Sequence, residues 1–217
     1  MGELRLSADT KRSAAVMAAL AELYPDARPE LNFTNPFETL IATILSAQCT
    51  DKRVNLVTAR LFPMYPDAKA MAALEPEQLE PLIRECGLYH SKARNIVAAC
   101  RALVKRYDGQ VPDDREKLMA LPGVGQKTAG VVLMAAFGDP QIPVDTHVFR
   151  VSRRIGLADE NTPQKVEKQL QAVIPRDMWT FAHHLLIWHG RRVCHAQKPN
   201  CAICPLDNGL CCHCVDK

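Results

Sequence analysis

The chain has 217 residues, of which 47% are hydrophobic and 24% charged, and its formal net charge is +3. This composition is typical of a globular protein with a substantial core and excludes a disordered chain. The longest uninterrupted apolar stretch, residues 131–137, is too short to cross a bilayer, and the polar start of the chain does not resemble a secretion signal. We therefore expect an intracellular, cytoplasmic protein. The excess of basic residues lies after residue 140, where 10 basic side chains face 7 acidic ones, which permits a polyanionic partner without requiring one.

Apolar spacing predicts helices along most of the chain. Pro76 is typical of the first turn of a helix, here one over residues 77–86 that ends at Gly87. A longer helix is predicted from Ser91, as N-cap, to Gly109. The apolar positions of that helix recur at helical intervals, at residues 93, 96, 97, 100, 103, 104 and 107.

Shorter helices are predicted further along. Asp113 and Glu116 form an acidic helix start, and the pair Thr162–Pro163 opens a helix that runs to about residue 173. We also expect a helix over residues 146–155 that ends at Gly156, and one over residues 176–189 that ends at Gly190. No convincing alternating strand pattern is present, so the sequence predicts an all-α fold with short connections.

A glycine-rich turn, Leu121-Pro122-Gly123-Val124-Gly125, separates two of these helices. Pro122 ends the first helix, and the two glycines supply backbone conformations that other residues avoid. The next helix begins near Gln126, and N–H groups at its start form a site suited to a phosphate. A tight turn that binds nothing is the alternative.

Cysteines are concentrated near the end of the chain, at Cys194, Cys201, Cys204, Cys211, Cys212 and Cys214. The Cys-x6-Cys-x2-Cys spacing places three thiolates on one loop, as in sites that hold structural zinc or an iron–sulfur cluster. The total of nine cysteines is odd and the chain shows no secretion signal, which argues against disulfides. Spacing alone does not distinguish a zinc site from an iron–sulfur site, because His195 and His213 are next to cysteines of this run and could bind zinc.

Three motifs then occur in order: Leu121-Pro-Gly-Val-Gly-Gln-Lys-Thr-Ala-Gly130, Val144-Asp-Thr-His-Val-Phe-Arg150 and the cysteine run. Two more, Leu45-Ser-Ala-Gln48 and Gly87-Leu-Tyr-His-Ser-Lys92, lie upstream. Together they closely resemble the endonuclease III family of DNA glycosylases, from about residue 31 to residue 211.

The resemblance implies a two-domain helical fold. Residues 29–139 would form a sequential helical domain containing a helix–hairpin–helix element. Residues 1–28 and 140–217 would form a second domain that holds a structural [4Fe–4S] cluster. The implied partner is double-stranded DNA containing damaged bases or abasic sites, bound by a monomer. The implied cluster ligands are Cys194, Cys201, Cys204 and Cys211.

The resemblance also implies an activity, the removal of oxidised pyrimidines followed by cleavage at the abasic site. Lys127 stands at the position of the family's catalytic lysine, whose neutral amine displaces the base and forms a Schiff base that permits β-elimination. Desolvation and a helix N-terminus both disfavour the ammonium form. Asp145 matches the catalytic aspartate, which would stabilise positive charge on the sugar. It also has the position of an N-cap, and both roles are compatible.

An enzyme that acts on a base within duplex DNA must rotate the nucleotide out and fill the space it leaves. The resemblance assigns Gln48 to that space and makes Leu88 an apolar wedge. The alternatives are a polar helix end for Gln48, a capping contact for Leu88 and a packing role for His147. The DNA-binding residues implied by the resemblance are Gln48, Leu88, Gly123, Val124, Gly125 and His147.

The chain departs from the family pattern in two places. The family usually has five residues between the third and fourth cysteines, whereas Cys204 to Cys211 leaves six and Cys204 to Cys212 leaves seven. We choose Cys211 because Leu210 preserves the apolar residue expected before the last ligand. Gln126 and Gly130 stand where many relatives carry a basic and an amide residue, and the missing charge beside the lysine predicts slower turnover.

Three other functions remain open on the sequence. One is a monofunctional glycosylase of the same superfamily, although Lys127 argues against its adenine-removing branch. Another is a DNA-binding iron–sulfur protein that carries electrons or senses redox state and does not cleave DNA. The last is a helical binding module held together by zinc.

Overall fold

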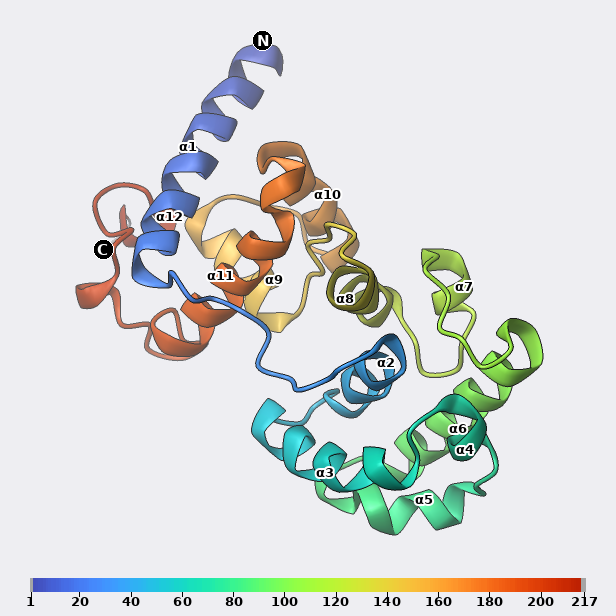
Figure 1. Cartoon of the computed structure of the whole chain (residues 1–217). Helices are drawn as coiled ribbons and strands as arrows, with labels where there is room; N and C mark the ends of the chain where they lie inside the picture. Colours follow the sequence, from blue (N-terminus) through green and yellow to red (C-terminus); the bar gives the residue numbers. More distant parts are fainter. Residues whose placement is uncertain (1, 216–217) are drawn as a thin grey trace. The chain divides into compact units, whose positions relative to one another are not determined.

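The computed structural model describes residues 2–215, with side chains for residues 10–213. Over these residues the regular structure is entirely helical, which confirms the predicted all-α class (Figure 1). No helix in the described part of the chain combines the length and the apolar composition needed to span a membrane.

The helices form two compact units, each with its own hydrophobic core. One unit comprises the chain up to Arg28 together with the chain from Pro140 onward, and the other comprises Pro29–Asp139. These ranges coincide with those expected for the two domains. That each range folds as an independent domain stays a prediction.

The unit Pro29–Asp139 is built around α2, in which every residue from Thr39 to Leu45 is buried. Asn35 caps this helix by accepting a hydrogen bond from the Glu38 N–H. Helix α2 packs against α8, and α6 packs against α4 and α5. The elements of this unit are α2 (Pro36–Leu45), α3 (Asp51–Met64), α4 (Ala68–Ala72), α5 (Pro76–Ile83), the 3-10 helix η1 (Arg84–Cys86), α6 (Tyr89–Tyr107), α7 (Arg115–Met119) and α8 (Gln126–Phe137).

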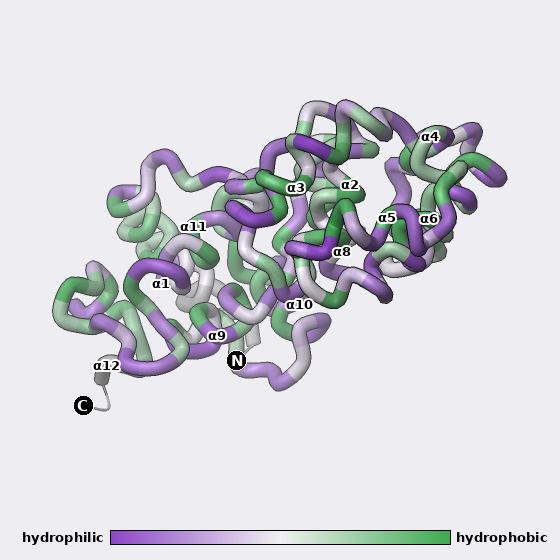
Figure 2. The backbone as a smooth tube through the Cα atoms, turned by 90° about the horizontal axis from the view of Figure 1, so that it is seen from below, coloured by the Kyte–Doolittle hydropathy of each residue, from purple (hydrophilic) through white to green (hydrophobic). Residues whose placement is uncertain are grey.

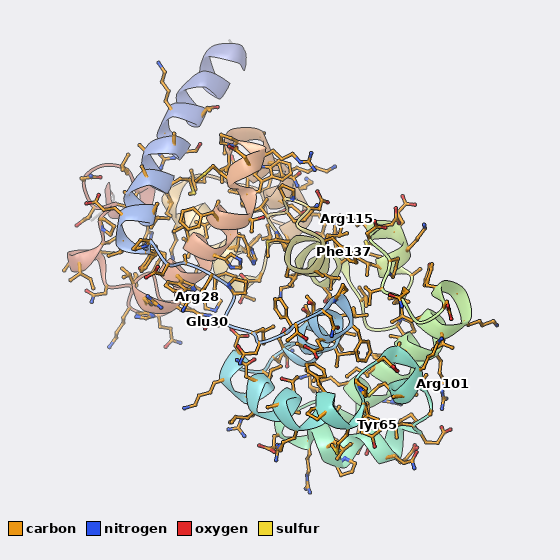
Figure 3. The ribbon with its side chains drawn as sticks, in the orientation of Figure 1. Arg28, Glu30, Tyr65, Arg101, Arg115 and Phe137 are labelled. Atoms are coloured by element: carbon orange, nitrogen blue, oxygen red, sulfur yellow. The ribbon has the colours of Figure 1, made fainter. Side chains whose placement is uncertain are left out.

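Polar side chains connect the elements of this unit at its surface. The guanidinium of Arg101, labelled in Figure 3, donates from α6 to the carbonyl oxygens of Ala72 and Leu74 and to the carboxylate of Glu75. These contacts join α6 to the connection between α4 and α5. Hydrophobic and hydrophilic residues follow one another at short intervals along the chain, as the colours of the tube in Figure 2 show.

In the other unit α11 packs against α9, and α1 packs against α10 and α11. Helix α9 begins after Asp145 and ends at Gly156, whose φ of +85° is the left-handed value typical of a helix end. The elements of this unit are α1 (Gly2–Leu23), α9 (Thr146–Ile155), α10 (Pro163–Val173), the 3-10 helix η2 (Arg176–Met178), α11 (Trp179–Arg192), the 3-10 helix η3 (Cys201–Ile203) and α12 (Cys212–Val215).

The predicted ends of α9 and α10 are confirmed, and so are the start of α5 at Pro76 and the stop at Gly87. The single helix predicted over residues 77–86 is wrong, because residues 84–86 form the separate 3-10 helix η1. Two predicted N-caps are wrong. Helix α6 begins at Tyr89, so Ser91 lies inside its first turn, where its hydroxyl donates to the Leu88 carbonyl. Helix α7 is capped by Asp114 rather than Asp113, since it is the Asp114 carboxylate that accepts from the Lys117 N–H.

The prediction that Gly190 ends a helix is also wrong. Helix α11 begins at Trp179, after a separate 3-10 turn, and continues through Gly190 to Arg192. A Cβ at position 190 would lie 3.0 Å from Val151 Cγ2 and 3.1 Å from His147 Nδ1, both on α9. Glycine therefore serves the close approach of two helices here and not a helix end.

Candidate functional site

The glycine-rich turn connects α7 to α8, and its two glycines have different roles. Gly123 has a φ of +76°, and a Cβ there would lie 2.8 Å from the Cβ of Asn95. Gly125 has a φ of −93°, extended backbone that any residue adopts, and nothing lies within 4 Å of its Cβ position. The expectation that both glycines supply unusual conformations is thus correct for Gly123 and wrong for Gly125. Val124 is buried, and its N–H donates to the Leu121 carbonyl at 3.1 Å, so it stabilises the turn itself.

Lys127 is the second residue of α8 and is half-buried. No acidic residue occurs in the first turn of α8, and Gly125, as N-cap, has no side chain to accept a hydrogen bond. The positive end of the helix dipole is therefore not offset by a carboxylate of that turn.

Asp145 is the N-cap of α9. Its Oδ1 accepts hydrogen bonds from the N–H groups of His147 and Val148, each at 2.8 Å. The N-cap role foreseen from the sequence is thus present, and both bonds use the same oxygen. His147 is half-buried with its Nδ1 3.2 Å from the guanidinium of Arg150, and burial lowers the pKa of its imidazole in spite of the nearby Asp145. Lys127 and Asp145 belong to different units of the chain.

Gln48 and Leu88 share an unusual backbone conformation. Their φ values are +52° and +49°, and both side chains are exposed, that of Leu88 by 56%. Residues other than glycine rarely adopt positive φ, and such strain is concentrated at functional sites. The exposure of Leu88 does not fit the alternative of an apolar capping contact, which would bury the side chain.

Lys92, in the same unit, contacts residues that come shortly before Gln48 and Leu88 in the chain. Its side chain is only 4% exposed, and its Nζ donates to the carbonyl oxygens of Leu45 and Cys86, each at 2.8 Å. Burial lowers the pKa of its ammonium, while the nearby Cys86 and Cys49 thiols act in the opposite direction. A sequence signal was available, because Lys92 falls on the apolar face of α6 four residues before Ile96.

Four cysteines surround one small cavity in the other unit. Cys194, Cys201, Cys204 and Cys211 all line it, together with His189 and His213. Burial raises the pKa of the Cys204 thiol, and the other three thiols are close enough to raise it further. Cys212, the other choice for a fourth ligand, is exposed, and its Sγ lies 3.3 Å from the guanidinium of Arg12 outside this cavity.

Three arginines fix the chain around these cysteines. Arg150 donates to the Cys194 carbonyl, and Arg154 donates to the His195 carbonyl and approaches Cys194 Sγ at 3.6 Å. Arg12 donates to the Leu210 carbonyl next to Cys211. Both ends of the cysteine loop are thereby attached to helices of the unit.

The arrangement of the thiols bears on which inorganic group they suit. Among the side chains that the structure describes, no three His, Cys, Asp or Glu residues converge so as to hold a single metal ion. An iron–sulfur cluster is larger than a single ion, and its four thiolates surround a volume. Four cysteines around one cavity fit this donor set, and His189 and His213 line the same cavity.

Comparison with known proteins places the chain in a family. Residues 41–176 match the HhH-GPD superfamily of base excision DNA repair proteins. The Endonuclease III of Synechocystis sp. is 46% identical over 204 residues, which cover 93% of this chain and 93% of that protein. The chain therefore belongs to the HhH-GPD superfamily of base excision DNA repair proteins, the class that its helical fold and hairpin indicate. Within that superfamily it belongs to the endonuclease III family.

Two solved structures share the fold over nearly the whole chain. One is a non-covalent Endonuclease III–DNA complex, and the other is a trapped Endonuclease III–DNA covalent intermediate with an estranged adenine. Each is 48% identical to this chain with a TM-score of 0.91, and each match covers 95% of this chain and 97% of the other.

Proposed function

We propose that this protein is a DNA glycosylase and AP lyase of base excision repair that removes oxidised pyrimidines from double-stranded DNA as a monomer. Membership of the endonuclease III family, and similarity to a relative trapped covalently on DNA, support both activities. The observation that carries the proposal is the place of Lys127, an amine in the first turn of α8 directly after the Gly123–Gly125 hairpin.

The chemistry assigned to Lys127 needs its neutral amine. The Nζ lone pair attacks C1′ of the damaged nucleotide, and the base leaves with the electrons of the glycosidic bond and takes up a proton. Loss of a proton from nitrogen and opening of the sugar give an iminium ion. Its electron withdrawal then permits removal of a C2′ proton and breakage of the C3′–O bond. The first turn of α8 holds no acidic residue, which supports this role, because a helix N-terminus disfavours an ammonium group beside it.

Asp145 supplies a carboxylate to the same reaction. Its Oδ1 is held by two backbone N–H groups, which fix the orientation of the side chain on α9. The second oxygen of the carboxylate can then stabilise positive charge on the sugar and accept or return a proton. The capping role and the catalytic role thus use different atoms of one side chain.

Apart from His147, the proposed DNA-binding residues form two groups within the unit Pro29–Asp139. Gln48 and Leu88 project from strained, exposed positions and enter the duplex where the damaged nucleotide leaves it. Gly123 and Gly125 present exposed backbone to a phosphate, with Val124 buried beneath them as a structural support. We retain His147 as a DNA contact through its place beside Asp145.

The four cysteines of the loop after α11 are the residues that would hold a [4Fe–4S] cluster. When bound, the cluster would cross-link the loop to its unit, a structural contribution and not a step of the reaction. Arg150 and Arg154 hold the start of this loop against α9, and Arg154 also approaches the Cys194 Sγ at 3.6 Å.

The test uses a duplex that carries a single thymine glycol, with base release and strand cleavage measured separately. Wild type is expected to give both products, and Lys127→Gln is expected to give neither. Asp145→Asn keeps an oxygen that can cap α9 and should lose most of the base release. Binding of the damaged duplex by wild type without either product would show that the protein is a DNA-binding protein and not an enzyme. Base release without strand cleavage would show a monofunctional glycosylase.

A further inference from the structure

Lys92 is a buried lysine whose ammonium joins two segments that are far apart in the sequence. Its Nζ lies 2.8 Å from the carbonyl oxygen of Leu45 and 2.8 Å from that of Cys86, and only 4% of the residue is exposed. Lysine is rarely buried unless it is paired, because its charge must leave water. The two hydrogen bonds are therefore the compensation that permits a cation here.

Each of the two carbonyls belongs to the last residue of a helix, and a residue with positive φ follows shortly after it. Leu45 is the last residue of α2, and Gln48 follows three residues later with a φ of +52°. Cys86 is the last residue of η1, and Leu88 follows two residues later with a φ of +49°. One nitrogen thus holds the starting points of both exposed loops.

The backbone of Lys92 strengthens the same link. Its N–H donates to the Leu88 carbonyl at 3.0 Å, so Lys92 contacts the chain both before Leu88 and at Leu88. On the other side, a cation at the C-terminus of α2 is attracted by the negative end of that helix. Since both carbonyls accept from one nitrogen, a displacement of either loop breaks a hydrogen bond to a buried charge.

We propose that Lys92 is a positioning residue that holds the Gln48 loop and the Leu88 loop in a fixed mutual arrangement, so that both side chains enter the duplex together. The inference rests on the DNA-inserting roles proposed above for Gln48 and Leu88. Lys92 itself does not touch the DNA or the reacting atoms. Its loss therefore impairs the steps that require insertion and leaves the chemistry of Lys127 intact.

The test compares two substrates for borohydride trapping, an abasic site in a duplex and the same abasic site in a single strand. Only the duplex requires insertion to expose the sugar. Lys92→Met keeps the apolar stem and removes the donors. It should slow duplex trapping about 10- to 100-fold, the effect of misplacing reacting groups by an ångström or so. Single-strand trapping should stay within about twofold of wild type.

Lys105→Met, an exposed lysine on the same helix, is the matched control and should leave both rates near wild type. If Lys92→Met does not fold, Lys92→Gln, which keeps an uncharged N–H donor, takes its place in the comparison. If Lys92→Met has the same ratio of duplex to single-strand trapping rates as wild type, the proposal is wrong, whether both rates are unchanged or both fall equally. If wild type is trapped on neither the duplex nor the single strand, the proposed function of Lys127 is refuted instead.

A second measurement separates positioning from general stability. In a Gln48→Ala, Leu88→Ala background the two inserting side chains are gone, so Lys92→Met should reduce duplex trapping by no more than about twofold further. If the loss from Lys92→Met is as large there as in wild type, Lys92 acts through the stability of the unit and the proposal is wrong.

Discussion

Replacement of Gly123 by alanine should destabilise the unit Pro29–Asp139 far more than the same change at Gly125, two residues away. At Gly123 a side chain meets two penalties. Its φ of +76° lies in the left-handed region, which costs an L-residue about 1–2 kcal/mol. The added Cβ would also lie 2.8 Å from Asn95 Cβ and 3.1 Å from its Cγ, and relief of such an overlap typically costs about 1–3 kcal/mol.

Part of this loss is offset, since alanine restricts the unfolded chain and returns about 0.4–1 kcal/mol. We therefore expect Gly123→Ala to lower the free energy of unfolding by roughly 2–4 kcal/mol, a large share of a typical domain's stability. At Gly125 the backbone is extended and the Cβ position is open, so Gly125→Ala should be neutral or slightly stabilising.

Urea denaturation followed by helical circular dichroism measures both variants, and binding of an abasic duplex measures their function. Gly125→Ala should fold normally and bind DNA more weakly, because its methyl group occupies the surface offered to a phosphate. If the two variants unfold at the same urea concentration, the assignment of strain to Gly123 is wrong. If Gly125→Ala binds DNA as wild type does, the hairpin does not contact the phosphate at this residue.

Three further predictions concern the unit that contains α9 and α11. Burial lowers the pKa of His184 to about 4, against about 6.5 in the unfolded chain, so only the unfolded chain gains its proton between these pH values. The contribution of His184 to the free energy of unfolding should therefore be constant above pH 6.5 and fall as the pH drops to 4, by at most about 3 kcal/mol. A His184→Gln variant whose stability has the same pH dependence as that of wild type would contradict this. Asp145→Ala should lower the free energy of unfolding by about 1 kcal/mol, whereas Asp145→Asn should not, since asparagine also caps helices. If both variants lose the same stability in a melting experiment, Asp145 does not stabilise α9 as its cap. Cys201→Ser should remove the visible absorbance of the purified protein and lower its melting temperature, whereas Cys212→Ser, outside the cysteine cavity, should change neither. Loss of the absorbance in Cys212→Ser would instead make Cys212 the fourth ligand.

Local signals in the sequence predict a large part of the fold. Helix α9 begins and ends where expected because Asp145 and Gly156 act on their own backbone. The sequence predicts a helix end at Gly190, and this prediction is wrong because the role of Gly190 depends on α9, a different helix that approaches it closely. The same limit applies to Gly125, whose conformation is ordinary although its residue type suggests otherwise.

For the candidate site, too, the sequence predicts what lies within one motif and not what depends on contacts between distant segments. The motifs locate Lys127, Asp145 and the cysteines, since each motif is continuous or nearly so in the sequence. The place of Lys92 on the apolar face of α6 indicates that it is buried, but not what it binds, because its acceptor Leu45 lies on another helix and a sequence does not show which backbone carbonyls accept. The positive φ values of Gln48 and Leu88 are likewise properties of the folded backbone.

The most direct test of the central claim is to identify the atom of the protein that joins the DNA. Wild type is incubated with an abasic duplex and borohydride, the adduct is digested, and the modified peptide is sequenced by mass spectrometry. We expect one adduct, on Lys127, and no adduct with Lys127→Gln. An adduct on a different amine, or one that forms as readily with Lys127→Gln, would contradict the claim.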